Sequence, residues 1–87
     1  MDFDRIEFTS HALLRMAERG ISKAEVVEVL MYPREKIVAN ENRFEARGLI
    51  VRGVKIMLLR VIYDHGAVVT VIAVVATSKL AKYGVTP

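Results

Sequence analysis

The chain contains no cysteine and only two histidines among its 87 residues. The absence of thiols excludes disulfide bonds, zinc–thiolate sites and thiol-based catalysis, because each of these needs a cysteine sulfur. A chain of this length buries only about 60 to 65% of its unfolded surface, which leaves little room for a deep pocket. We therefore expect no metal and no other cofactor, and a site that lies on the surface or in a shallow groove.

The sequence also lacks an apolar stretch long enough to cross a membrane. Its longest apolar region, residues 54–76, is interrupted by an arginine, an aspartate and a histidine, whereas a spanning helix needs about 20 consecutive apolar residues. Residues 1–5 are acidic and lead into no apolar run, so they do not have the pattern of a secretory signal. These features predict a soluble, cytoplasmic protein with no membrane partner.

Neither sign of charge is in large excess. Thirteen basic residues are offset by ten acidic ones, which gives a net charge of +3 at pH 7. This balance permits an anionic partner such as RNA but does not require one. A hydrophobic fraction of 53% with 26% charged residues is typical of a folded globular chain, and the length corresponds to a single domain over residues 1–87.

Two capped helices are predicted near the N-terminus, after a short strand or extended lead-in at residues 4–8. The first helix begins at a threonine or serine N-cap and ends at Gly20, which is suited to a left-handed C-terminal position. Ser22 and Glu25 form an S-x-x-E capping box that begins the second helix. That helix ends just before Pro33, because the residue preceding a proline disfavours the helical conformation.

From residue 34 onward the apolar pattern changes from helical to strand-like, and the only later proline is the last residue. Candidate strands cover residues 36–39, 43–51, 54–63 and 67–76. We expect a three-residue loop between the last two strands, and a tail that forms a helical turn or a mobile flap. The predicted fold class is α+β, with two N-terminal helices on one face of an antiparallel sheet of about four strands.

The first predicted helix has an unusual polar face. At roughly 100° per residue, His11, Arg15 and Arg19 share one side of the helix with Glu18. An imidazole can act as base or acid near neutral pH, and guanidinium groups can hold a phosphate. RNA cleavage through the 2′-hydroxyl needs such a base, cations at the phosphate and an acid for the leaving oxygen. The alternative is a solvated helix face in which the arginines pair with Glu18 or Asp4.

A second candidate pair lies on the last two predicted strands. If the loop between them covers residues 64–66, Arg60 is opposite Thr70 on one face of the sheet, and we expect both to face His11. A guanidinium among apolar residues must find a partner or a groove, because burying it alone is costly. Arg60 is thus a candidate phosphate ligand. The alternative is an arginine that reaches solvent at the sheet edge, and a two-residue loop would remove the pair.

Residues 11–21 read H-A-x-x-R-M-x-x-R-G-I. Together with the capping-box helix, the proline and the Thr- and Val-rich strands, this motif resembles a small uncharacterised prokaryotic family of domains of unknown function, grouped with the RelE/ParE toxins. The resemblance covers most of the chain and implies a RelE/ParE-like fold, a metal-independent RNA endonuclease and a neutralising antitoxin. Lys79, Lys82 and Tyr83 are similar to C-terminal residues that ribosome-dependent relatives use, although a solvated tail is the alternative.

The sequence therefore predicts a toxin-like RNA endonuclease of a toxin–antitoxin system. The proposed catalytic residues are His11, Arg15, Arg60 and Thr70, and the proposed substrate-binding residues are Arg19, Lys79, Lys82 and Tyr83. Expected partners are RNA, free or ribosome-bound, and an antitoxin protein, and an exposed sheet edge leaves a homodimer open.

Two other interpretations remain at this point. One is a non-catalytic binding module of the same fold, which acts on a protein or a nucleic acid. The other is a degenerate family member in which His11 is buried or turned away. Geometry separates the first from an enzyme, because a nuclease needs His11 within reach of the groove that holds Arg60, whereas a binding module tolerates them on separate surfaces.

Overall fold

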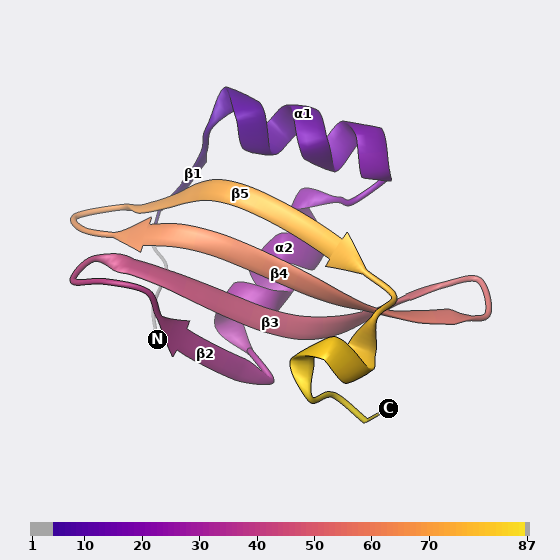
Figure 1. The fold of residues 1–87 in the computed structure, drawn as a ribbon. Coiled ribbons are helices and arrows are strands. Elements are labelled where there is room, and N and C mark those ends of the chain that lie inside the picture. The colour runs from indigo at the N-terminus through magenta and orange to yellow at the C-terminus, as the bar shows by residue number, and fades with distance from the viewer. Residues whose placement is uncertain (1–4, 87) are drawn as a thin grey trace.

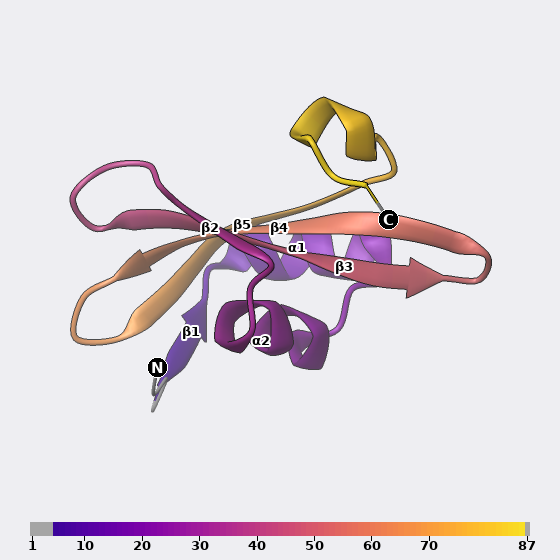
Figure 2. The same cartoon turned by 90° about the horizontal axis from the view of Figure 1, so that it is seen from below.

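A five-stranded mixed sheet carries two helices on one face in the computed structural model, which describes residues 5–86. The helices α1 and α2 lie on one side of the sheet, and a short 3₁₀ helix, η1, lies on the other (Figure 1, Figure 2). The α+β class is as predicted, but the sheet has five strands instead of about four. In chain order the elements are β1 (Ile6–Phe8), α1 (Ser10–Arg19), α2 (Lys23–Met31), β2 (Glu35–Val38), β3 (Arg43–Arg52), β4 (Lys55–His65), β5 (Val69–Thr77) and η1 (Leu80–Tyr83).

The additional strand is β1, and it makes the sheet mixed instead of purely antiparallel. Residues Ile6–Phe8 pair in parallel with Val69–Val71, so the spatial order of the strands is β1-β5-β4-β3-β2. The pattern at residues 4–8 indicated a short strand, but it could not show a partner more than 60 residues away in the chain. Asp4, the first residue of that predicted stretch, lies outside the described residues.

Local capping chemistry determines where the helices begin and end. The Thr9 hydroxyl accepts a hydrogen bond from the Ala12 N–H, at 3.1 Å. The predicted capping box is present, since Ser22 and Glu25 each accept a hydrogen bond from the other's main-chain N–H, at 3.1 and 3.0 Å. Gly20 ends α1 with φ of 64°, where a side chain would be strained.

No helix within residues 5–86 is long and apolar enough to cross a membrane.

The hydrophobic core lies between the two helices and the sheet. Each helix buries one side against alternate residues of β3, β4 and β5, as the period of two along a strand requires. On α1 the buried residues are Ala12 and Met16, whereas Leu13 and Leu14 stay 39% and 59% exposed. The other buried residues of this core are Ile21, Val26, Val29, Leu30, Ala46, Ile50, Leu59, Val61, Tyr63, Val69, Val71 and Val74.

The loop between β4 and β5 begins two residues later than predicted, because His65 still pairs with Val69. A register irregularity within these two strands then shifts the remaining pairs. Arg60 consequently lies opposite Val75, and the predicted pair of Arg60 with Thr70 is wrong. Continuing the register of His65 with Val69 would already place Arg60 opposite residue 74, so the position of the loop causes most of the difference. The irregularity adds one further residue to β5, which a count from the loop cannot include.

Gly48 of β3 lets α2 approach the sheet closely, and this generates a prediction about stability. A Cβ at this position would lie 2.8 Å from Cγ2 of Val29, and a branched valine side chain has few other rotamers. We expect Gly48→Ala to lower the free energy of unfolding by about 1–3 kcal/mol in urea denaturation. Gly66→Ala is the matched control, since no atom lies within 4 Å of its Cβ position. Equal stability of Gly48→Ala and wild type would contradict this packing.

Arg52, at the end of β3, ties the sheet to the start of α2. Its guanidinium donates to both carboxylate oxygens of Glu25, at 2.5 and 2.6 Å, and to the carbonyl of Gly20, at 2.9 Å. Hydrogen bonds from Arg52 and from the Ser22 N–H lower the pKa of Glu25 from 4.5 to about 2. Because the pKa is lower in the folded state, the stabilisation is complete above pH 4.5 and is lost as the pH falls toward 2.

We therefore expect the wild-type protein to lose more stability than Glu25→Gln over this acidic range. The glutamine variant lacks the titrating group, so its free energy of unfolding should be lower at neutral pH and should fall less between pH 4.5 and about 2. Urea denaturation at several pH values measures both curves. Parallel curves for the two proteins would show that Glu25 does not carry this pH dependence.

Candidate functional site

A groove of about 260 Å³ runs between α1 and β5. Three basic side chains of α1, His11, Arg15 and Arg19, line one wall, and residues 73–75 of β5 form the other. The three side chains come from successive turns of the helix, with a rise of about 6 Å between them. The structure thus brings together three of the predicted site residues along one open surface.

The groove exists because β1 is shorter than β5. β1 pairs with three of the nine residues of β5. Thr9 continues the edge by donating its N–H to the Val71 carbonyl, at 3.0 Å, and its hydroxyl to the Ile72 carbonyl, at 3.2 Å. The chain then enters α1, so residues 73–77 have no strand beside them on this side within the described chain. Figure 1 shows α1 running along this uncovered part of β5.

The basic side chains of the groove are largely free to meet a ligand. Arg15 donates one long hydrogen bond of 3.4 Å to Glu18, and both side chains are 50% exposed. Neither His11 nor Arg19 forms a hydrogen bond or an ion pair with another residue in the range 5–86. Of the two acidic partners predicted for the arginines, Glu18 pairs with Arg15, and Asp4 lies outside the described residues. A hydrated cation of this kind can exchange water for an anion without first losing a strong partner.

The groove has the chemistry of an anion site. Guanidinium groups carry donors only, so Arg15 and Arg19 cannot bind a cation but can each present paired N–H groups to phosphate oxygens. The imidazole of His11 can take up or release a proton beside them. Within residues 5–86, no three histidine, aspartate or glutamate side chains come together as a metal site would require. This arrangement can bind a phosphodiester and move a proton next to it.

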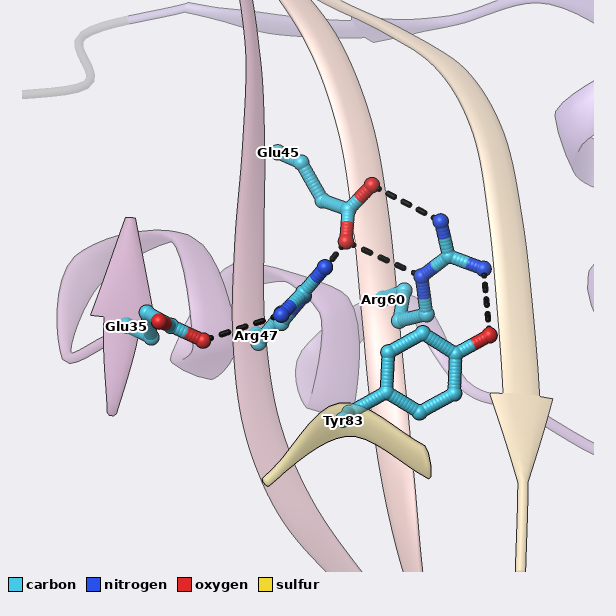
Figure 3. Close-up of polar contacts among 5 residues, drawn as sticks. All are labelled: Glu35, Glu45, Arg47, Arg60 and Tyr83. Atoms are coloured by element: carbon cyan, nitrogen blue, oxygen red, sulfur yellow. Dashed lines mark hydrogen bonds and ion pairs between the residues drawn. The ribbon is translucent and has the colours of Figure 1, made fainter. Parts of the chain in front are cut away.

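A second polar cluster lies on the opposite face of the sheet, beneath η1 (Figure 3). The Glu45 carboxylate accepts two hydrogen bonds from Arg60, each of 2.9 Å, and one from Arg47, of 2.5 Å. Arg47 also donates to Glu35, at 3.0 Å, and Arg60 donates to the Tyr83 hydroxyl, at 3.1 Å. The Tyr83 ring lies about 5 Å from both guanidinium carbons. The cluster therefore joins β2, β3, β4 and η1.

The charges of this second cluster neutralise one another. Hydrogen bonds from Arg60, and then from Arg47, lower the pKa of Glu45, and the same carboxylate raises the pKa of Arg60. The side chains of Glu45, Arg47 and Arg60 are only 12%, 15% and 23% exposed. A phosphate that entered here would have to displace a carboxylate already in place. We interpret the cluster as the contact that holds η1 on the sheet.

The predicted site residues thus fall in three separate places. His11, Arg15 and Arg19 line the groove, Arg60, Lys82 and Tyr83 gather at η1 with Lys79 just before it, and Thr70 lies in a third hollow near the β4–β5 loop. The expected composite site, with His11 facing Arg60, does not form. The sheet separates them, because Arg60 alternates with core residues of β4 and so points away from the helices, toward Tyr83 of η1 (Figure 3).

The acidic members of the second cluster were not among the predicted site residues. A signal for them is present, since positions 43, 45 and 47 carry charge while the residues between them are apolar. That alternation predicts a polar outer face of the strand. What it cannot show is that Glu45 reaches two arginines. This depends on the pairing of β3 with β4, which places Arg47 opposite Arg60.

The cluster at η1 generates a prediction about stability. Glu45→Ala removes the carboxylate that both partly buried guanidinium groups share, which leaves Arg60 with the neutral Tyr83 hydroxyl and Arg47 with Glu35. We therefore expect a loss of about 1.5–3 kcal/mol in the free energy of unfolding. Glu7→Ala is the matched control, because Glu7 forms an exposed pair with Arg5 that should contribute less than about 1 kcal/mol. Thermal and urea denaturation measure both variants. A loss for Glu45→Ala no larger than that for Glu7→Ala would contradict the proposed structural role.

Comparison with known proteins identifies a family for the chain without identifying an activity. No curated protein and no solved structure matches the sequence. Residues 8–79 match a family described as Domain of unknown function (DUF4258). This range contains both helices, the groove and strands β2 to β5. The chain belongs to the DUF4258 family.

Proposed function

We propose that this protein is a toxin-like, metal-independent RNA endonuclease, related to the RelE/ParE toxins, that binds the RNA backbone in the groove between α1 and β5. The observation that carries the proposal is the row formed by His11, Arg15 and Arg19 along an open groove. Residues four apart on a helix are separated by a rise of about 6 Å, and such a row fits a chain of phosphates better than one small anion. The exposed edge of β5 adds main-chain donors and acceptors to the same surface.

Each basic side chain of the groove has a role in the proposed reaction. His11 takes the proton of the 2′-hydroxyl, while Arg15 and Arg19 hold the non-bridging oxygens as charge builds on them. The 2′-oxygen then bonds to phosphorus, and the bond from phosphorus to the 5′-oxygen breaks. The leaving oxygen takes a proton from water or from protonated His11. The products are a 2′,3′-cyclic phosphate and a free 5′-hydroxyl, and the guanidinium groups supply the cationic charge.

The proposed relation to the RelE/ParE toxins extends to partners. An antitoxin protein would neutralise the enzyme, and the RNA would be free or bound to the ribosome. Because messenger RNA and ribosomes lie in the cytoplasm, the proposal implies a cytoplasmic protein. The net charge of +3 supports an anionic partner, because it favours encounter with a polyanion at low salt.

A non-catalytic binding module is the second candidate, and one specific observation favours it. Arg60 lies across the sheet from His11 and is occupied by Glu45 and Tyr83. Among residues 5–86, the side chains that line the groove include no titratable group besides His11 and the two arginines. In this version of the function, the groove holds RNA or an acidic protein and no bond is broken.

Incubation with labelled single-stranded RNA in excess chelator tests the enzyme, with ribosome-bound message as a second substrate. We expect cleavage by the wild type to leave 2′,3′-cyclic phosphate ends, and His11→Ala to lower the rate by a factor of about 10² or more. The matched control is His65→Ala, which removes the other imidazole, one that lies against the rings of Phe44 and Tyr63 outside the groove. This control should keep its activity if it remains folded.

The same incubation separates the two candidate functions. RNA binding by the wild type without cleavage of either substrate contradicts the endonuclease and supports the binding module. Cleavage that survives His11→Ala removes the groove as the reaction centre. Cleavage that disappears in chelator contradicts metal independence. RNA affinity, measured in parallel by filter binding, should fall for Arg15→Ala and Arg19→Ala in either case, because both arginines contact phosphate.

A further inference from the structure

One wall of the groove is an open main-chain edge of the sheet. The proposed contacts to RNA phosphates use the basic side chains and leave this edge without a role. Beyond Ile72, no strand within residues 5–86 pairs with this side of β5. α1 runs alongside this part of β5 (Figure 1), and its residues Ala12 and Met16 pack in the core that contains Val71 and Val74, while a groove remains between the helix and residues 73–75. Residues 73–77 pair with β4 on one side, and their N–H and C=O groups that point to the other side have no strand partner within residues 5–86 and lie beside a row of basic side chains. Such an edge can accept another strand by main-chain hydrogen bonding.

The charge beside this edge restricts what can bind there. If two copies of the chain paired through β5, the basic faces of their α1 helices would come together, with His11, Arg15 and Arg19 repeated on each side. Like charges placed across an interface oppose association. An acidic segment would instead be attracted to the same arginines. The electrostatics thus favour an acidic partner over a second copy.

We propose that the open edge of β5 binds an extended acidic segment of a partner protein, which adds to the sheet as a sixth strand. The side chains of such a strand point alternately to the two faces of the sheet. Those on the helix side would meet Arg15 and Arg19, and those on the other side would lie beside Val75, which is 37% exposed. The segment that fits therefore alternates acidic and apolar residues.

The repeats of the two elements agree with this arrangement. Side chains on one face of a strand recur every ~6.4–6.8 Å, and side chains four residues apart on a helix recur after about 6 Å. α1 and β5 run in the same direction along the groove (Figure 1). Carboxylates at two successive inward positions of the added strand can therefore reach Arg15 and Arg19 together. Main-chain hydrogen bonds would supply affinity, and the ion pairs would select the acidic sequence.

A second groove, which also lies between a helix and an edge of the sheet, provides an internal contrast. It lies between α2 and the part of β3 that extends beyond β2, and it is lined by Glu25, Glu28 and Arg34 together with residues 48–50. Glu25 is already paired with Arg52, so Glu28 and Arg34 leave no excess of positive charge. An acidic segment is therefore expected at the edge of β5 and not at this edge of β3.

Binding of a fluorescent nine-residue peptide with alternating glutamate and valine or threonine tests the proposal on the full chain. Fluorescence anisotropy should show saturable binding that weakens with salt, and a peptide with lysine in place of glutamate should not bind. Arg15→Ala and Arg19→Ala should each weaken binding about two- to fivefold. Lys55→Ala, which removes an exposed cation at the β3–β4 turn that does not line the groove, is the matched control and should bind as the wild type does.

Two peptides with alternate main-chain amides methylated, one for each edge of the peptide strand, separate strand addition from simple ionic attraction. Methylation on the edge that faces β5 removes the donors but keeps every carboxylate, so we expect binding to be lost for one peptide only. Hydrogen exchange with the unmethylated peptide should slow within residues 73–77.

Three results would overturn the proposal. They are equal binding of both methylated peptides, protection of residues 48–52 in place of 73–77, and dimerisation of the protein alone that blocks the peptide, which would assign the edge to a second copy. These titrations contain no RNA, and the inference does not depend on RNA cleavage. Failure of the proposed nuclease activity would therefore leave each of the three readouts unchanged.

Discussion

The parallel pairing of β1 with β5 is the contact on which the rest of the structure depends. It joins the start of the chain to its last strand, and Thr9 both extends the pairing and caps α1. α1 is thereby placed along β5, with its small and flexible residues in the core and its basic residues at the rim. Because the pairing involves only three residues, the same contact that positions α1 leaves most of the outer edge of β5 uncovered. The groove is a consequence of that short strand.

The two faces of the sheet use charge in different ways. Beneath η1, Glu45 lies between Arg47 and Arg60, and each guanidinium has a carboxylate within hydrogen-bonding distance. Such a set stabilises the attachment of η1 and offers little net charge to a ligand. In the groove, His11 and Arg19 have no partner within residues 5–86. A partly buried charge needs a partner in the folded protein, whereas an exposed charge is hydrated and can bind a ligand of opposite charge.

RNA and an acidic strand present the same chemistry to the groove. A phosphate backbone and a strand with alternate carboxylates both carry repeated negative charge at a spacing that Arg15 and Arg19 can follow. They differ in what else they offer, since only a peptide strand can continue the main-chain hydrogen bonding of β5. A partner that uses both features would occupy the surface proposed for RNA, which is how a binding protein can control a nuclease without changing its fold.

The sequence by itself determined the elements whose causes are local. The caps at Ser22 and Gly20, the proline after α2 and the alternating strands act over a few residues, and the predicted elements agree with the structure to within two or three residues at each end. The row of His11, Arg15 and Arg19 followed from helical period for the same reason. Tertiary structure alone decided the parallel partner of β1, the register of β4 and β5 that places Arg60 opposite Val75 instead of Thr70, and the face on which Arg60 lies. Each of these depends on which strands pair and in which register, and on how the sheet packs against the helices, which no local pattern encodes.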